Sequence, residues 1–96
     1  MTHGYVSDKK ALVKRLHRIE GQVRGIERMV EDERYCIDIL TQIGAVSTAL
    51  DSLAVKLLED HVSHCVTDAL ASGDAATAEE KGRELLDAVQ RFAKTR

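Results

Sequence analysis

The chain has 96 residues and a formal net charge of -2. It lacks proline and is rich in Ala, Leu, Glu, Lys and Arg, a composition that favours helices. The length predicts a single small domain over 1–96, and because a core of this size is marginal for a monomer we expect oligomerisation. No apolar run approaches the roughly 20 residues of a membrane span, and the polar first ten residues lack the apolar core of a signal peptide. We therefore expect a cytoplasmic protein without membrane contact.

The first predicted helix begins after Ser7, the expected N-cap, and Asp8 suits the positive end of the helix dipole. Apolar residues recur along this helix at alternating spacings of four and three residues. This heptad-like stripe comprises Leu12, Leu16, Ile19, Val23, Ile26 and Val30. Such a stripe favours packing along another helix.

The first helix is also basic, although the chain as a whole is slightly acidic. Between Lys9 and Arg28, seven basic side chains outnumber two acidic ones, which leaves a local charge of +5. The segment indicates a nucleic-acid-binding face, with a solvated helix surface as the alternative.

A break is expected at 32–34, followed by a long second helix from about residue 35 to about residue 69. Its predicted buried side comprises Ile39 or Leu40, Ile43, Val46, Leu50, Leu53, Leu57 and Val62. The turn residues at 72–74 end it. A third helix is expected over about 77–93, with the inward residues Leu85, Leu86, Val89 and Phe92. The pattern predicts an all-α protein with three helices.

Three residues supply the donor atoms of a candidate metal site. His61 and Cys65 lie four residues apart on the second helix and therefore share one face, and Cys36 is the only other cysteine. A helix rises about 1.5 Å per residue, so roughly 38 Å separates Cys36 from His61 on one straight helix. The three can meet if two chains pack their second helices antiparallel, which would give two identical sites.

Two thiolates and one imidazole suit a soft metal ion. Structural zinc usually takes four protein ligands, whereas three ligands in a trigonal arrangement suit copper(I). His3 and His64 are further nitrogen donors, which keeps zinc, nickel and cobalt open. Taken singly, a packed thiol or a structural histidine is the commoner role of such residues. An enzyme is not expected, because the sequence has no phosphate-binding Gly-rich loop and no nucleophile elbow.

Three stretches resemble the copper-sensitive operon repressors. Residues 14–26 read KRLHRIEGQVRGI, like the first-helix signature of that family. Residues 35–43 (YCIDILTQI) are similar to the start of its second helix, and 61–65 (HVSHC) match its second ligand pair. The resemblance extends from His3 to Phe92. It implies a three-helix protomer that forms an antiparallel dimer, paired into a disc-shaped tetramer. It also implies a repressor that binds operator DNA without metal and leaves it when copper(I) binds.

The resemblance assigns roles to particular residues. It implies a copper(I) site made of Cys36 from one chain with His61 and Cys65 from its partner. Tyr35 matches a tyrosine that lies beside the metal ligands in the family. Glu84 is the best match to a third-helix glutamate that also lies beside these ligands.

For DNA binding, Arg15 matches the first-helix contact position of the family, and we expect Lys14 and Arg18 to support it. The chain departs from the family at Ser52, where some members carry an arginine. The predicted fold has no helix-turn-helix, so no recognition helix can be assigned.

Two branches of the superfamily offer alternatives to copper. Nickel or cobalt sensors have a histidine at the last ligand position, where this chain has Cys65. Persulfide sensors use two cysteines with no histidine ligand, and His61 argues against them. We therefore predict a copper(I)-responsive repressor. A persulfide or disulfide sensor, a nickel or cobalt sensor, and a helical structural or copper-buffering protein remain as alternatives.

Overall fold

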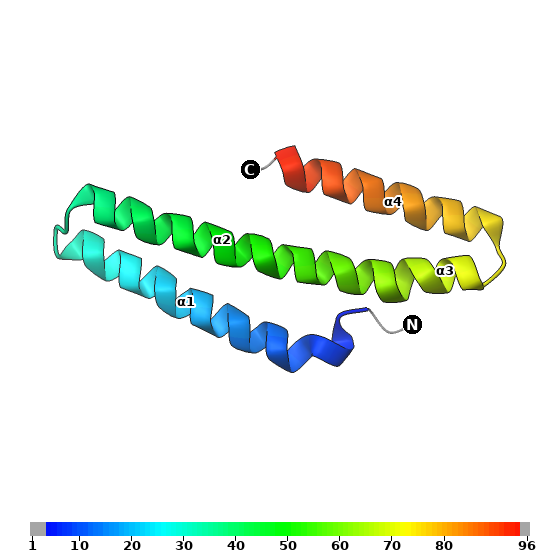
Figure 1. Ribbon diagram of the computed structural model, residues 1–96, viewed down its shortest axis with the longest axis horizontal. Coiled ribbons are helices and arrows are strands. Elements are labelled where there is room, and N and C mark those ends of the chain that lie inside the picture. Colours follow the sequence, from blue (N-terminus) through cyan, green and yellow to red (C-terminus); the bar gives the residue numbers. More distant parts are fainter. Residues whose placement is uncertain (1–3, 95–96) are drawn as a thin grey trace. The chain divides into compact units, whose positions relative to one another are not determined.

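The computed structural model describes residues 4–94, apart from the side chains of Cys65 and Val66, and every regular element there is a helix (Figure 1). A 3₁₀ turn, η1 (Val6–Asp8), leads into α1 (Lys9–Glu31), which α2 (Cys36–Asp60) follows. The helical backbone continues from α2 through the π-helical turn η2 (His61–Val66) into α3 (Thr67–Ala71), and α4 (Ala75–Lys94) comes last. The prediction of an all-α protein is confirmed. The three predicted helices correspond to α1, to α2 continued through η2 and α3, and to α4. His3 lies outside the described residues.

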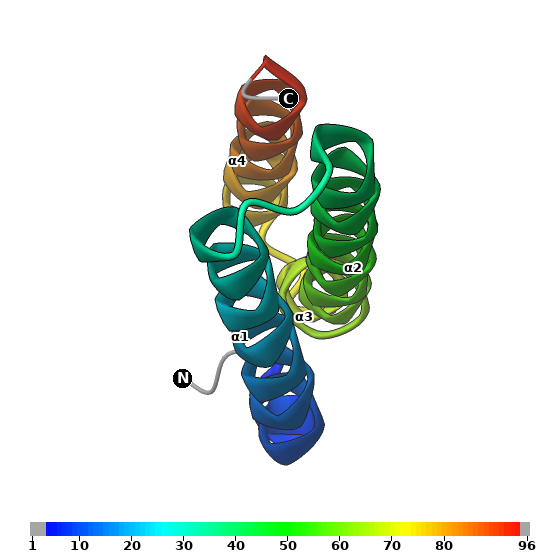
Figure 2. The ribbon, with the colours of Figure 1, turned by 90° about the vertical axis from the view of Figure 1, so that its left-hand side faces the viewer.

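The described residues form two compact units, one made of 5–58 and the other of Gly4 with 59–94. In the first unit, α1 and the first part of α2 form an antiparallel hairpin, and Figure 2 looks onto its connection. Leu12 and Ile19 are buried on α1, and Val46 and Leu53 are buried on α2. The spacing is seven residues on each helix, as expected where two heptad stripes pack together. The prediction of a single domain over 1–96 stays a prediction.

The connection between α1 and α2 closes α1 through a left-handed residue. Glu33 has φ 55°, and its N–H donates to the Val30 carbonyl at 3.1 Å. The Arg34 N–H donates to the Met29 carbonyl at 3.0 Å. This pair of bonds is a common helix ending, in which glycine usually takes the position that Glu33 occupies. The predicted break at 32–34 is therefore confirmed.

The prediction of Ser7 as the N-cap of the first helix is wrong. Ser7 lies inside η1, whose Asp8 N–H donates to the Tyr5 carbonyl at 2.9 Å, and α1 begins at Lys9. A residue inside a helical turn cannot take the extended backbone of an N-cap. The Asp8 carboxylate instead lies 3.3 Å from the Lys56 Nζ, which ties the start of α1 to α2.

The last helix begins at Ala75, two residues before the predicted start, because Asp74 caps it. Asp74 Oδ1 accepts the N–H groups of Ala76 and Thr77 at 3.0 and 3.3 Å, and Oδ2 accepts the Thr77 hydroxyl at 2.7 Å. The hydrogen bond from the Thr77 hydroxyl, together with those from the backbone, holds the pKa of Asp74 below its ordinary value.

Many apolar residues predicted to face inward are exposed in the single chain. This group comprises Leu16, Val23, Val30, Ile43, Leu50, Leu57, Val62, Leu86, Val89 and Phe92. The prediction of their burial is wrong for one chain, because each helix is covered by its neighbours over only part of its apolar face. Of the alternatives Ile39 and Leu40, Ile39 is half-buried and Leu40 is exposed. Exposed apolar surface on this scale is typical of a protein that associates. Within the described residues, no helix is both long enough and apolar enough to span a membrane.

Candidate metal and DNA sites

The first predicted ligand lies at the start of α2. Cys36 is the first residue of this helix, and its thiol is free and exposed. Tyr35 precedes it with an exposed side chain, and its carbonyl accepts the N–H groups of Asp38 and Ile39 at 3.1 and 3.3 Å. The helix start thus presents both a thiol and a phenol to solvent.

The other predicted ligands lie in η2, directly after α2. His61 is half-buried and His64 is exposed, and the backbone of Cys65 belongs to the same π-helical turn. The turn ends at Val66, and the N–H and hydroxyl of the next residue, Thr67, both donate to the Val62 carbonyl, the hydroxyl at 2.9 Å. A π-helical turn is rare and often marks a functional site. The sequence predicted a regular α-helix here, and no residue pattern distinguished the wider turn.

Gly4 is buried against this part of the chain. A Cβ atom at Gly4 would overlap the backbone carbonyl of Asp60 and lie 3.2 Å from the Cβ of His64. The close approach therefore requires glycine and brings the start of the described chain against the turn that carries His61 and His64. The sequence analysis missed this contact, because an isolated glycine gives no signal of a neighbour so distant in sequence.

Replacing Gly4 with alanine should destabilise the protein, by about 1–3 kcal/mol as for other overpacking substitutions. Gly82→Ala is the matched control, because a Cβ at Gly82 meets nothing within 4 Å and the change should improve helix propensity by about 1 kcal/mol. Thermal unfolding should show a lower Tm for the first variant and an equal or higher Tm for the second. A Gly4→Ala protein as stable as the wild type would contradict the contact.

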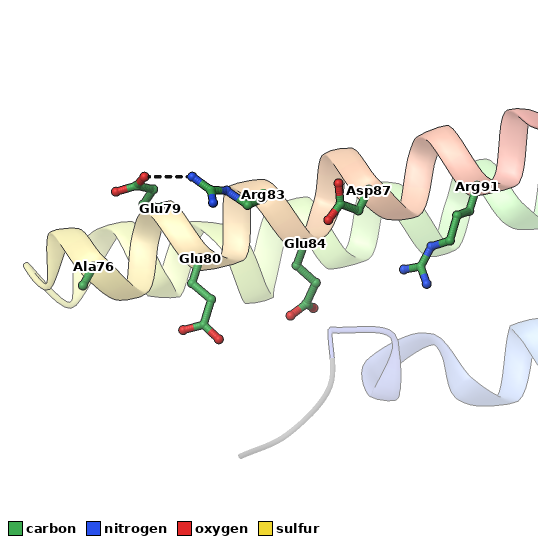
Figure 3. Close-up of a pocket in the computed structure, with 7 residues that line it drawn as sticks. All are labelled: Ala76, Glu79, Glu80, Arg83, Glu84, Asp87 and Arg91. Carbon is green, nitrogen blue, oxygen red and sulfur yellow. Dashed lines mark hydrogen bonds and ion pairs between the residues drawn. The ribbon is translucent and has the colours of Figure 1, made fainter.

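Glu84, the predicted outer residue of the copper site, lies on the exposed face of α4. Its Oε2 lies 3.6 Å from the Lys81 Nζ. Figure 3 shows the shallow depression of about 470 Å³ around it, whose lining residues all belong to α4. Glu79 and Arg83 pair at 3.1 Å there, while Glu80 and Glu84 point to the same side. In the part of the chain described, no three His, Cys, Asp or Glu side chains gather as metal ligands.

The predicted DNA-binding cations lie on α1. Lys14 and Arg18 are exposed, whereas Arg15 is half-buried and its guanidinium donates to the Ser52 hydroxyl at 3.0 Å. Arg24, two and a half turns beyond Arg15 on the same helix, is already paired with Glu20 at 2.6 Å. The sequence identified Ser52 only as a departure from the family, because its contact with Arg15 depends on the register between the two helices.

The described chain thus combines a basic helix, an exposed thiol and an imidazole in a π-helical turn on an all-helical scaffold. The chain belongs to the metal-sensitive transcriptional repressor family, whose profile matches residues 8–91. The family predicted from the sequence motifs is thereby confirmed. The chain is 52% identical to the copper-sensing transcriptional repressor RicR of Mycobacterium tuberculosis (strain ATCC 25618 / H37Rv), over 97% of this chain and 96% of that protein.

Two solved structures resemble the fold. The copper-sensing repressor CsoR with Cu(I), from Geobacillus thermodenitrificans NG80-2, superposes with a TM-score of 0.84 at 49% identity, over 92% of this chain and 88% of that chain. The nickel-responsive transcriptional regulator InrS superposes with a TM-score of 0.76 at 43% identity, over 86% of this chain and 90% of that chain. Both are metal-responsive regulators.

Proposed function

We propose that the chain is a copper(I)-responsive transcriptional repressor that acts in the cytoplasm. It binds operator DNA in its metal-free form and leaves the DNA when copper(I) binds. The observation that carries this proposal is the likeness to copper-sensing repressors over nearly the whole chain, together with the presence of Cys36, His61 and Cys65. These repressors regulate transcription, and we assign no catalytic residue.

The donor set fits copper(I). Two cysteines and one histidine offer two thiolates and one imidazole, and soft sulfur ligands select copper(I) over harder ions. The thiol of Cys36 is exposed and His61 is half-buried, so both are within reach of an incoming ion. When bound, copper(I) supplies a charge centre that links these side chains.

We place each site between two chains. Cys36 is the first residue of α2 and His61 follows its last residue, so the whole of this 25-residue helix separates them in sequence. Two α2 helices packed antiparallel would bring Cys36 of one chain to His61 and Cys65 of the other. The exposed residues Ile43 and Leu50 of α2 offer apolar surface for this pairing. The same reasoning supports an antiparallel dimer, with two dimers forming the disc-shaped tetramer.

We propose that Tyr35 and Glu84 lie next to the ligands of the copper site. A histidine that ligates a metal through one ring nitrogen normally donates from the other to an acceptor that fixes the ring. Here Tyr35 or Glu84 would accept from His61, which would connect the ligand turn to α4 or to the partner chain. Because the ligands and the DNA-binding cations are different residues, their coupling is an allosteric free energy between two sites.

A nickel sensor is the second candidate, favoured by the likeness to InrS. The two sulfur donors favour copper(I) over nickel(II). Thiolates are soft ligands that suit copper(I), whereas nickel(II) suits a site rich in nitrogen donors.

Anaerobic titration with copper(I) should give one tightly bound ion per chain, and X-ray absorption should show short copper–sulfur scattering with a nitrogen shell. Nickel(II) and zinc(II) titrations serve as comparisons. Substituting Tyr35 or Glu84 should preserve the copper spectrum while weakening the release of DNA. A coordination shell of nitrogen and oxygen alone would rule out the proposed ligands.

A further inference from the structure

A hollow of about 380 Å³ lies between α1 and α2 of the hairpin. Its α1 wall carries two guanidinium groups and an amide, whereas its α2 wall consists of small side chains and two hydroxyls. The residues that line it are Arg15, Arg18, Ile19 and Gln22 from α1, and Ala45, Thr48, Ala49 and Ser52 from α2. The small α2 residues leave room for a ligand beside the cations.

The charges around the hollow are arranged for an anion. No carboxylate belongs to the described residues that line it. Arg15 is held by a neutral hydroxyl, since its guanidinium donates to Ser52 Oγ at 3.0 Å. Its charge is therefore not neutralised by this contact, in contrast to Arg24, which is paired with Glu20 at 2.6 Å. A guanidinium has five N–H donors, so the bond to Ser52 leaves others for a ligand.

We propose that this hollow is a binding subsite for a phosphate of the DNA backbone, in which Ser52 is the residue that positions Arg15. The inference rests on the proposed function and deepens it by naming the ligand group and the residue that orients the cation. Arginine binds phosphate through paired N–H groups. Hydroxyl and amide side chains, such as those of Thr48 and Gln22, commonly donate hydrogen bonds to the phosphates of the DNA backbone. A guanidinium already fixed in place loses less freedom when phosphate arrives.

The test compares DNA affinity for Ser52→Ala, Arg15→Ala and the double variant, with Ser52→Thr as the conservative replacement. Ser47→Ala is the matched control, because Ser47 lies on the same helix and outside the hollow. Loss of one hydrogen bond that orients Arg15 should weaken binding about two- to tenfold in Ser52→Ala. Ser52→Thr should retain most of the affinity, and Ser47→Ala should match the wild type.

Two readouts separate a positioning role from a general structural one. In the Arg15→Ala background, adding Ser52→Ala should cause no further loss, because Ser52 acts through Arg15. The fold-loss of Ser52→Ala should also be equal on operator and on unrelated duplex DNA, since phosphate contacts carry no sequence information. Ser52→Asp should weaken both complexes more strongly, because a carboxylate would neutralise Arg15.

Three results would overturn the inference: unchanged affinity in Ser52→Ala, an undiminished loss in the Arg15→Ala background, or a loss confined to the operator. These are distinct from failure of the proposed function, in which the wild-type chain would show no preference for its operator or no response to copper(I). Binding to unrelated DNA tests the phosphate subsite even in that case.

Discussion

Mixing Cys36→Ala chains with His61→Ala/Cys65→Ala chains should restore copper(I) sites that neither variant forms alone. Each variant by itself should lose more than about 100-fold in copper affinity, because loss of a direct ligand costs more than loss of an outer contact. In the mixed dimer, one pairing contains intact Cys36 from one chain and intact His61 and Cys65 from the other. One complete site of the two should therefore return.

The control for this experiment is proof that mixed dimers form, for example by separating chains that carry different affinity tags. Copper(I) binding to the purified mixed dimer should reach half the wild-type stoichiometry with near wild-type affinity. If verified mixed dimers bind no copper tightly, the ligands come from a single chain and the antiparallel arrangement of α2 helices is wrong.

Replacing Arg15 with alanine should weaken operator binding by about 10- to 100-fold while leaving copper(I) binding unchanged. DNA affinity should fall steeply with salt in the wild type, because each phosphate contact releases counterions. Arg15→Ala should flatten this dependence by about one unit for each phosphate contact removed. Filter binding or fluorescence anisotropy over a range of salt concentrations measures both effects.

Arg24→Ala is the matched control for Arg15. Both arginines lie on α1, but Arg24 is paired with Glu20 at 2.6 Å and does not line the hollow beside α2. Its removal should change the affinity and the salt dependence little. If Arg15→Ala binds operator as tightly as the wild type, the basic face of α1 is a solvated surface and the DNA contacts lie elsewhere.

The helices and their connections could largely be predicted from local sequence. The break at 32–34 and the turn at 72–74 depend on neighbouring residues alone, and the structure confirms both. The prediction of Ser7 as the N-cap was wrong because the helical backbone of η1 already begins at Val6, before Ser7. Asp74 was not predicted as the N-cap of the last helix, because the sequence analysis assigned it to the turn that ends the preceding helix.

Burial was the least predictable property of the helices. The heptad stripe identified Leu12 and Ile19 correctly, but Leu16 and Val23 belong to the same stripe and are exposed in the single chain. Periodicity shows which residues share a face, whereas the partner that covers the face depends on tertiary or quaternary contacts. The same stripe is consistent with a hairpin and with an oligomer.

The candidate sites could also be predicted only in part from the sequence. Residue type and spacing were enough to select Cys36, His61 and Cys65 as ligands and Arg15 as a DNA contact, and these assignments stay predictions. The π-helical turn at η2, the close approach of Gly4 and the bond from Arg15 to Ser52 depend on contacts between distant residues. No pattern in one segment encodes them.

Operator binding with and without copper(I), under anaerobic reducing conditions, tests the central claim most directly. A labelled promoter fragment that the metal-free chain binds should lose affinity by about 5- to 150-fold when one copper(I) per chain is added, the usual range of allosteric coupling. The Cys36→Ala chain should bind the same fragment and show no response to the metal. Full retention of the fragment by a copper-loaded wild-type chain would contradict the account of a copper-released repressor.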